Sequence, residues 1–153
     1  MSTRRERVAL RDGAVEALDR SEDQGVGVRV RVGGAWGFAA TRQSTPAGAE
    51  QALRRALEVA QAASAARGVE LAPEPPARGE YAGPCLEDPF AVSLEDKLAL
   101  LGAADEALRA QPGLAVARAE LTALEVRTEF ASTEGGLYSQ RLTECGAGLV
   151  ATA

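Results

Sequence analysis

Alternating apolar and polar positions are the clearest signal in the first part of the chain. Valine occupies every second position from Val26 to Val32, with glycine or arginine at the positions between. A period of two is typical of a strand with one buried face. Gly33–Gly34 follows directly, and two glycines suit a turn whose central residues need positive φ. The pattern therefore predicts a hairpin in which residues 35–41 return beside the valine strand.

A second hairpin is predicted nearer the N-terminus. Asp12–Gly13 lies between two segments, 4–11 and 14–22, that mix apolar and charged residues. Asp-Gly is a strong two-residue turn signal because both of its residues tolerate positive φ. We therefore expect Gly13 to be a turn residue between two paired strands.

The C-terminal third also has strand character. Residues 114–130 contain an alternation at Leu124, Val126, Thr128 and Phe130, and residues 137–144 and 146–152 are predicted as two further strands. Between the first two of these segments, residues 132–136 are rich in small and polar residues and include Gly135, which predicts a turn.

Helical spacing marks two segments between these strands. The first begins at Thr45–Pro46, where threonine can cap and proline suits the first turn, and Gly68 is the expected stop. Its expected packing face is rich in alanine and consists of Ala49, Ala52, Leu53, Ala56, Leu57, Ala60 and Ala63. The second begins after Ser93 and ends before Pro112–Gly113. Its apolar stripe consists of Leu94, Leu98, Leu101, Ala104 and Leu108.

The order of these elements predicts an α+β fold with mostly antiparallel sheet and two helices. We expect one domain over residues 1–153, built from two halves, 1–71 and 91–153. Residues 72–90 hold five of the seven prolines and should form an extended connector between the halves. Three side chains are expected to attach this connector to the domain: Tyr81, Cys85 and Phe90.

Composition narrows the classes of function. The chain has 153 residues and a net charge of −5, which argues against nucleic-acid binding because a phosphate backbone requires a basic face. No apolar run approaches the roughly 18 residues that a membrane helix needs. The charged N-terminus does not resemble a secretory signal, so a cytoplasmic location is expected.

The absence of histidine limits the catalytic chemistry. Without this residue the chain cannot form Ser-His-Asp or Cys-His sites or a histidine-ligated zinc centre. Cys85 and Cys145 are more readily explained as reduced than as bridged, and a reactive cysteine remains an alternative although no histidine is present to activate it. A hydrolase using neighbouring carboxylates is another alternative, with the candidate pairs Glu87–Asp88 and Glu95–Asp96. Neighbouring acids usually form caps or surface charge, so no catalytic or metal-binding residue is predicted.

The glycines and aromatic residues of the valine hairpin raise two further questions. A dinucleotide loop places its glycines between a strand and a helix, whereas Gly25 and Gly27 lead into a strand, so a hairpin is favoured. Trp36 and Phe38 share one face of their strand. Core packing is the ordinary interpretation of these two rings, and docking of a peptide is the alternative.

Several segments resemble the N-terminal domain of the TldD/PmbA (TldE) family, whose members are also known as proposed modulators of DNA gyrase. Residues 25–30 read GVGVRV and residues 34–39 read GAWGFA, and the second block is fairly specific for the family. Asp12–Gly13, Ser21 and Asp23 occupy the places of the family's preceding turn and strand end. Two later segments are similar but weaker alone, DPFAVSLEDKLALL (88–101) and FASTEGGLYSQRLTECGAGLVATA (130–153).

The resemblance implies a function as well as a fold. Family members are much longer, and the metallopeptidases among them carry an HExxxH zinc motif in their second half, which has no counterpart in this histidine-free sequence. The resemblance also implies a leading helix and strand before the equivalent of Arg4, so one sheet edge is expected to lack its usual cover.

The expectation is therefore a non-catalytic N-terminal domain of a cytoplasmic zinc peptidase, inactive alone and without a cofactor of its own. It would pair with another TldD/PmbA-type subunit, as a homodimer or heterodimer, and would admit unfolded peptide to the enzyme. The residues expected to bind peptide are Arg29, Arg31, Trp36 and Phe38, although solvated strand positions are the ordinary interpretation of the two arginines. The alternative is a stand-alone regulatory module that pairs with a full-length relative.

Overall fold

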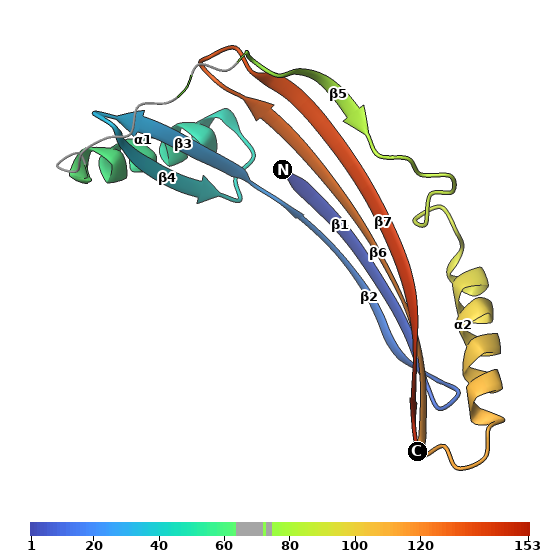
Figure 1. Ribbon diagram of the computed structural model, residues 1–153. Coiled ribbons are helices and arrows are strands. Elements are labelled where there is room, and N and C mark those ends of the chain that lie inside the picture. The colour runs from blue at the N-terminus through green and yellow to red at the C-terminus, as the bar shows by residue number, and fades with distance from the viewer. Residues whose placement is uncertain (64–71, 73–74) are drawn as a thin grey trace. The chain divides into compact units, whose positions relative to one another are not determined.

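The computed structural model describes residues 1–63, 72 and 75–153 (Figure 1). Within these residues the chain forms strands and helices in the order ββββαβαββ. The strands are β1 (Ser2–Arg11), β2 (Ala14–Gln24), β3 (Val26–Val32), β4 (Ala35–Thr41), β5 (Arg78–Ala82), β6 (Val116–Ala131) and β7 (Leu137–Thr152). The helices are α1 (Pro46–Ala62) and α2 (Leu94–Arg109).

The strands form two sheets. A five-stranded sheet has the order β2-β1-β6-β7-β5, and β3 pairs with β4 in a separate two-stranded sheet. Strand β5 runs parallel to β7, because Leu137 donates to the carbonyl of Ala77 and Gly83 donates to the carbonyl of Arg141. Most of the remaining pairing is antiparallel, so the predicted α+β class with two helices is confirmed.

The described chain divides into two compact units. The first, called the hairpin unit, comprises Met1–Ser2, Asp23–Gly79 and Glu129–Tyr138 and contains β3, β4 and α1. The second, called the long-strand unit, comprises Thr3–Glu22, Glu80–Thr128 and Ser139–Ala153 and contains α2. Each unit therefore combines segments from distant parts of the sequence.

Turn chemistry explains why both predicted hairpins form. Asp12 and Gly13 adopt φ values of 50° and 84°, and Gly33 and Gly34 adopt 57° and 87°. Two successive residues with positive φ give the turn twist that suits paired strands. The turn after β6 likewise uses Gly135, whose φ is 93°.

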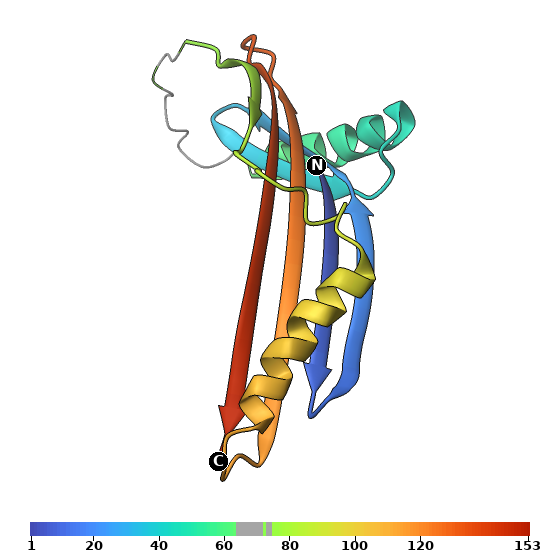
Figure 2. The ribbon, with the colours of Figure 1, turned by 90° about the vertical axis from the view of Figure 1, so that its right-hand side faces the viewer.

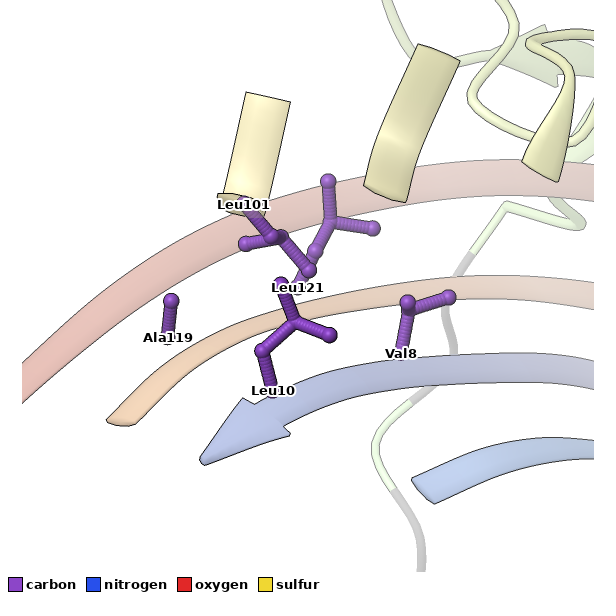
Figure 3. Packing of buried hydrophobic residues seen from close by; sticks show 5 residues of the cluster. All are labelled: Val8, Leu10, Leu101, Ala119 and Leu121. Atoms are coloured by element: carbon purple, nitrogen blue, oxygen red, sulfur yellow. The ribbon is translucent and has the colours of Figure 1, made fainter. Parts of the chain in front are cut away.

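The core of the long-strand unit lies between α2 and its sheet. Val8 and Leu10 of β1, Ala119 and Leu121 of β6, and Leu101 of α2 converge there, as Figure 3 shows. Leu98 packs against the edge of this cluster. Figure 2 shows α2 running over the sheet in this region.

The C-terminal strand and the proline-rich connector differ from the sequence prediction. Residues 137–152 form one continuous strand instead of two, because Gly146 and Gly148 are accommodated in extended backbone. The proline-rich connector contributes β5, while Tyr81 and Cys85 are exposed and do not attach it to the surface. The ring of Phe90 is half-buried and stacks against the guanidinium of Arg4, as expected of an anchoring residue.

Both helices begin where the sequence predicts. The Thr45 side chain caps α1 by accepting from the Gly48 amide, and the Ser93 side chain caps α2 by accepting from the Asp96 amide. Helix α1 ends at Ala62, and Gly68, the expected stop, lies outside the described residues.

Candidate functional site

The register of β3 and β4 brings the four candidate residues together. Arg29 pairs with Phe38 and Arg31 pairs with Trp36 across the two strands. Directly opposite residues on an antiparallel pair project from the same face of the sheet. The structure therefore places Arg29, Arg31, Trp36 and Phe38 on one surface, called here the aromatic face.

Both aromatic rings on this face are accessible. Trp36 is 47% exposed and Phe38 is 59% exposed. Each ring also leans along the sheet toward a diagonal neighbour. The guanidinium of Arg29 lies 5.9 Å from the centre of the Trp36 ring, and the Phe38 ring lies so close to Gly27 that a Cβ there would be 3.1 Å from it. Gly27 thus leaves room for the ring of Phe38.

Helix α1 covers the other face of the hairpin. A Cβ added to Gly37 would lie 1.9 Å from the Ala56 carbonyl oxygen and 2.7 Å from the Ala60 nitrogen, so the helix backbone touches the strand here. Of the predicted packing face, Ala52, Ala56 and Ala60 are buried, whereas Leu53 is 40% exposed and Ala63 is also exposed. Because α1 packs on this side (Figure 1), the aromatic rings are left on the open side.

This arrangement contradicts the core-packing interpretation of Trp36 and Phe38. Alternation along β4 places these two rings on one face, and α1 covers the face that carries Ala35 and Gly37. Because β4 carries small residues wherever it meets the helix, close backbone packing replaces the contact that large side chains would otherwise make.

Within the described part of the chain, the outer edges of the two-stranded sheet are open. Among the residues that the structure describes, β3 hydrogen-bonds as a strand only to β4, and β4 only to β3. The hairpin is tied at its base by an ion pair in which the Arg42 guanidinium donates to the Asp23 carboxylate at 2.6 Å, and these hydrogen bonds lower the pKa of Asp23. The aromatic face is thus bordered by strand edges whose backbone groups can pair with an added strand.

Sequence reasoning missed a second group of polar residues, in the long-strand unit. Glu6 and Lys97 are buried and form an ion pair, and Arg20 donates to the same carboxylate at 2.6 Å. Burial raises the pKa of Glu6, but the hydrogen bonds from Lys97 and Arg20 outweigh it, and the net pKa is lowered.

A signal for this cluster was present in the sequence. Lys97 and Asp105 lie four residues on either side of Leu101, on the buried face of α2. Charged residues at such spacing within an apolar stripe indicate buried ion pairs.

The structure offers little support for the other candidate sites, which are the neighbouring carboxylates and the two cysteines. Asp88 accepts from the Phe90 amide, and Asp96 accepts from the hydroxyl of Ser93, so both acids have local hydrogen bonds. The cysteine thiols are unbridged and exposed. Across residues 1–63, 72 and 75–153, no group of three or more histidine, cysteine, aspartate or glutamate residues is placed to hold a metal ion. The residues present therefore do not fit the zinc centre that the resemblance implies. None of the helices described here is long and apolar enough to cross a membrane.

Solved structures of similar fold provide a comparison. A proposed modulator of DNA gyrase from Bacteroides thetaiotaomicron matches 95% of this chain with a TM-score of 0.76 and 17% identity. TldE from Thermococcus kodakarensis matches 99% with a TM-score of 0.70 and 12% identity. A proposed modulator of a DNA gyrase from Thermotoga maritima matches 98% with a TM-score of 0.67 and 16% identity. This chain spans 33–35% of the length of these three proteins.

Sequence comparison with family models identifies the family. A search of curated proteins gave no match. The model of PmbA/TldA metallopeptidase domain 1 matches residues 1–60, and the model of the PmbA/TldA metallopeptidase central domain matches residues 87–153. These two models describe successive domains of one family and together match more than half of the sequence. The chain therefore belongs to the PmbA/TldD family.

Proposed function

We propose that this chain is a non-catalytic part of a TldD/PmbA-type metallopeptidase that holds unfolded peptide and pairs with a second TldD/PmbA-type subunit. The peptide would lie extended along the β3–β4 hairpin, with its side chains against the aromatic face. Catalysis would come from a zinc-bearing region that carries the histidines this chain lacks. The expected setting is cytoplasmic.

The observation that carries the proposal is the exposure of Trp36 and Phe38 on a sheet whose outer edges pair with no other strand among the described residues. Two large rings side by side in water are costly unless a partner covers them. An extended peptide added to a strand edge gains main-chain hydrogen bonds regardless of its sequence, while its alternate side chains reach the neighbouring face. Such binding suits an enzyme that accepts many unfolded peptides.

The arginines add a preference for charge. Arg29 and Arg31 stand on the same face as the rings, opposite Phe38 and Trp36. Their guanidinium groups can pair with acidic side chains or with the C-terminal carboxylate of a peptide. We therefore expect acidic peptides to bind more tightly than basic peptides of equal length.

The binding step can be tested by fluorescence anisotropy with a labelled peptide that is unfolded in solution. Replacing both Trp36 and Phe38 with alanine should weaken binding about 30-fold, as expected when two aromatic anchors are lost. The matched control replaces Leu86 and Leu100, which are 107% and 61% exposed, with alanine. The control should bind like the wild type, and equal binding by the aromatic variant would refute the proposed surface.

The catalytic role can be tested by mixing. The chain alone should not cleave peptide, while a mixture with a TldD/PmbA subunit that carries the zinc motif should, with a higher KM when Trp36 and Phe38 are replaced. Cleavage by the purified chain alone would contradict the non-catalytic assignment. Failure of the two chains to co-elute in size-exclusion chromatography would contradict subunit pairing.

A further inference from the structure

The long-strand unit contains a pocket lined by three arginines. It has a volume of about 310 Å³, and its walls include Arg4 and Arg5 of β1, Arg20 and Glu22 of β2, the buried Glu6, and the ring of Phe90. We propose that this pocket binds a small molecule through an oxyanion group, a carboxylate or a phosphate. This site lies outside the aromatic face and does not depend on the function proposed for it.

The charge in and beneath the pocket favours an anion. Lys97 forms an ion pair with Glu6, so this cation counts with the side chains of Arg4 and Arg20 against the carboxylates of Glu6 and Glu22. Three cations against two carboxylates leave an excess of one positive charge. The whole chain carries a net charge of −5, so this local excess runs against the overall balance. An anion entering the pocket would be attracted where most of the protein would repel it.

The arginines also keep hydrogen-bond donors for a ligand. Arg4 and Arg20 project from the face of the sheet that carries Glu6, because Arg4 lies two residues before Glu6 in β1 and Arg20 bonds Glu6. Arg20 uses its Nε to bond Glu6 at 2.6 Å, and the Nε of Arg4 lies 3.6 Å from Glu22. A guanidinium group has five N–H donors, so the terminal nitrogens of both side chains stay available. Forked donors of this kind match the two oxygens of a carboxylate or phosphate.

Neighbouring residues hold the side chains of Arg4 and Arg20 in place. The guanidinium of Arg4 stacks on the Phe90 ring, with its central carbon 4.3 Å from the ring centre. Phe90 is held in turn by its amide, which donates to Asp88 at 2.9 Å. Arg20 is fixed by the buried Glu6, whose lowered pKa keeps it ionised at neutral pH. A pocket of this volume suits a metabolite of a few carbon atoms more than a large cofactor.

The test is an NMR titration of the full chain at low ionic strength, with inorganic phosphate and succinate as separate probes. Signals of the Arg4 and Arg20 side chains and of the Phe90 amide should shift and saturate with at least one probe. The probe with the lower Kd identifies the preferred oxyanion. Raising the salt concentration should weaken binding, because the arginines are partly exposed to solvent.

Two substitutions make the test specific. Arg4→Gln should raise the Kd about fivefold, since it removes an exposed pocket charge whose ion pair with Glu22 is long, at 3.6 Å. Arg55→Gln is the matched control, because Arg55 is an exposed arginine of α1 outside the pocket, and it should leave the Kd unchanged. Shifts that fail to saturate with both probes, or an equal effect of the two substitutions, would overturn the proposal.

Discussion

Replacing Gly37 with alanine should disrupt the packing of α1 on the β3–β4 hairpin. The added Cβ would lie 1.9 Å from the Ala56 carbonyl oxygen, 2.7 Å from the Ala60 nitrogen and 3.0 Å from the Ala56 carbonyl carbon. All three atoms belong to helix backbone, so no side-chain rotation can relieve the overlap. The helix or the strand must move by more than about 1 Å to restore van der Waals contact.

The size of the effect follows from this geometry. Adding one methyl group to a well-packed site usually costs about 1–3 kcal/mol. Gly37→Ala belongs at the upper end of that range, because the buried alanines of α1 leave no flexible atoms to give way. We therefore expect the free energy of unfolding of the hairpin unit to fall by about 3 kcal/mol.

The assay is urea denaturation followed by two probes. Trp36 is the sole tryptophan and lies next to Gly37, so its fluorescence reports on the hairpin unit, while far-UV circular dichroism reports on the whole chain. The matched control is Gly102→Ala in α2, where an added Cβ meets nothing within 4 Å. This control should stabilise the protein by about 0.5–1 kcal/mol, because alanine favours a helix interior. If Gly37→Ala unfolds at the same urea concentration as the wild type, the inferred contact between α1 and β4 is wrong.

Three further predictions concern the long-strand unit. Lys97→Met should lower the free energy of unfolding by about 3 kcal/mol, because it leaves the carboxylate of Glu6 buried without its ion-pair partner. In urea denaturation, the double variant Glu6→Gln/Lys97→Met should lose less free energy of unfolding than the sum of the losses of the two single variants. Stability should also fall in acid. At Glu6 and Glu125, burial raises the pKa but hydrogen bonds from basic side chains lower it further, so the folded pKa lies below the unfolded one. The resulting stabilisation is complete above about pH 4.3, the pKa of an unfolded glutamate, and is lost as the pH falls through the pKa of the folded state. A urea midpoint that does not decrease between about pH 7 and pH 3 would contradict this prediction. Asp12→Val should lower the free energy of unfolding by about 2 kcal/mol, as measured by thermal unfolding. Valine disfavours the φ of 50°, and it cannot accept the hydrogen bond that Asp12 accepts from the Ala117 amide at 2.8 Å. The control Asp12→Asn should cost much less.

Local signals predicted most of the elements. The Asp12–Gly13 and Gly33–Gly34 turns, the threonine and serine helix caps, and the alternation of Val26–Val32 all depend on residues that are neighbours in sequence. Steric limits on φ and short-range hydrogen bonds decide these features, so a sequence shows them without knowledge of the fold. The single strand over 137–152 was missed because a glycine weakens a strand locally, while pairing with β6 sustains it.

The candidate site was predicted only in part. Alternation placed Trp36 and Phe38 on one face of a strand, and the register then put them opposite Arg31 and Arg29. Which face is exposed depends on where α1 packs, and the sequence suggested the wrong answer because large rings are usually buried. Gly37 provides the reason in hindsight, since a glycine between two aromatics permits a helix to approach the other face.

The amino-acid sequence by itself determined the turns, the caps, the strand faces and, through the lack of histidine, the absence of a histidine-ligated centre. The tertiary structure alone decided that β5 joins the sheet edge beside β7, that Lys97 meets Glu6 across 91 residues, and that Arg4 and Arg20 meet at one pocket. The physical reason is range: φ preferences and capping act between neighbours, whereas burial and charge pairing depend on which distant segments the fold brings into contact.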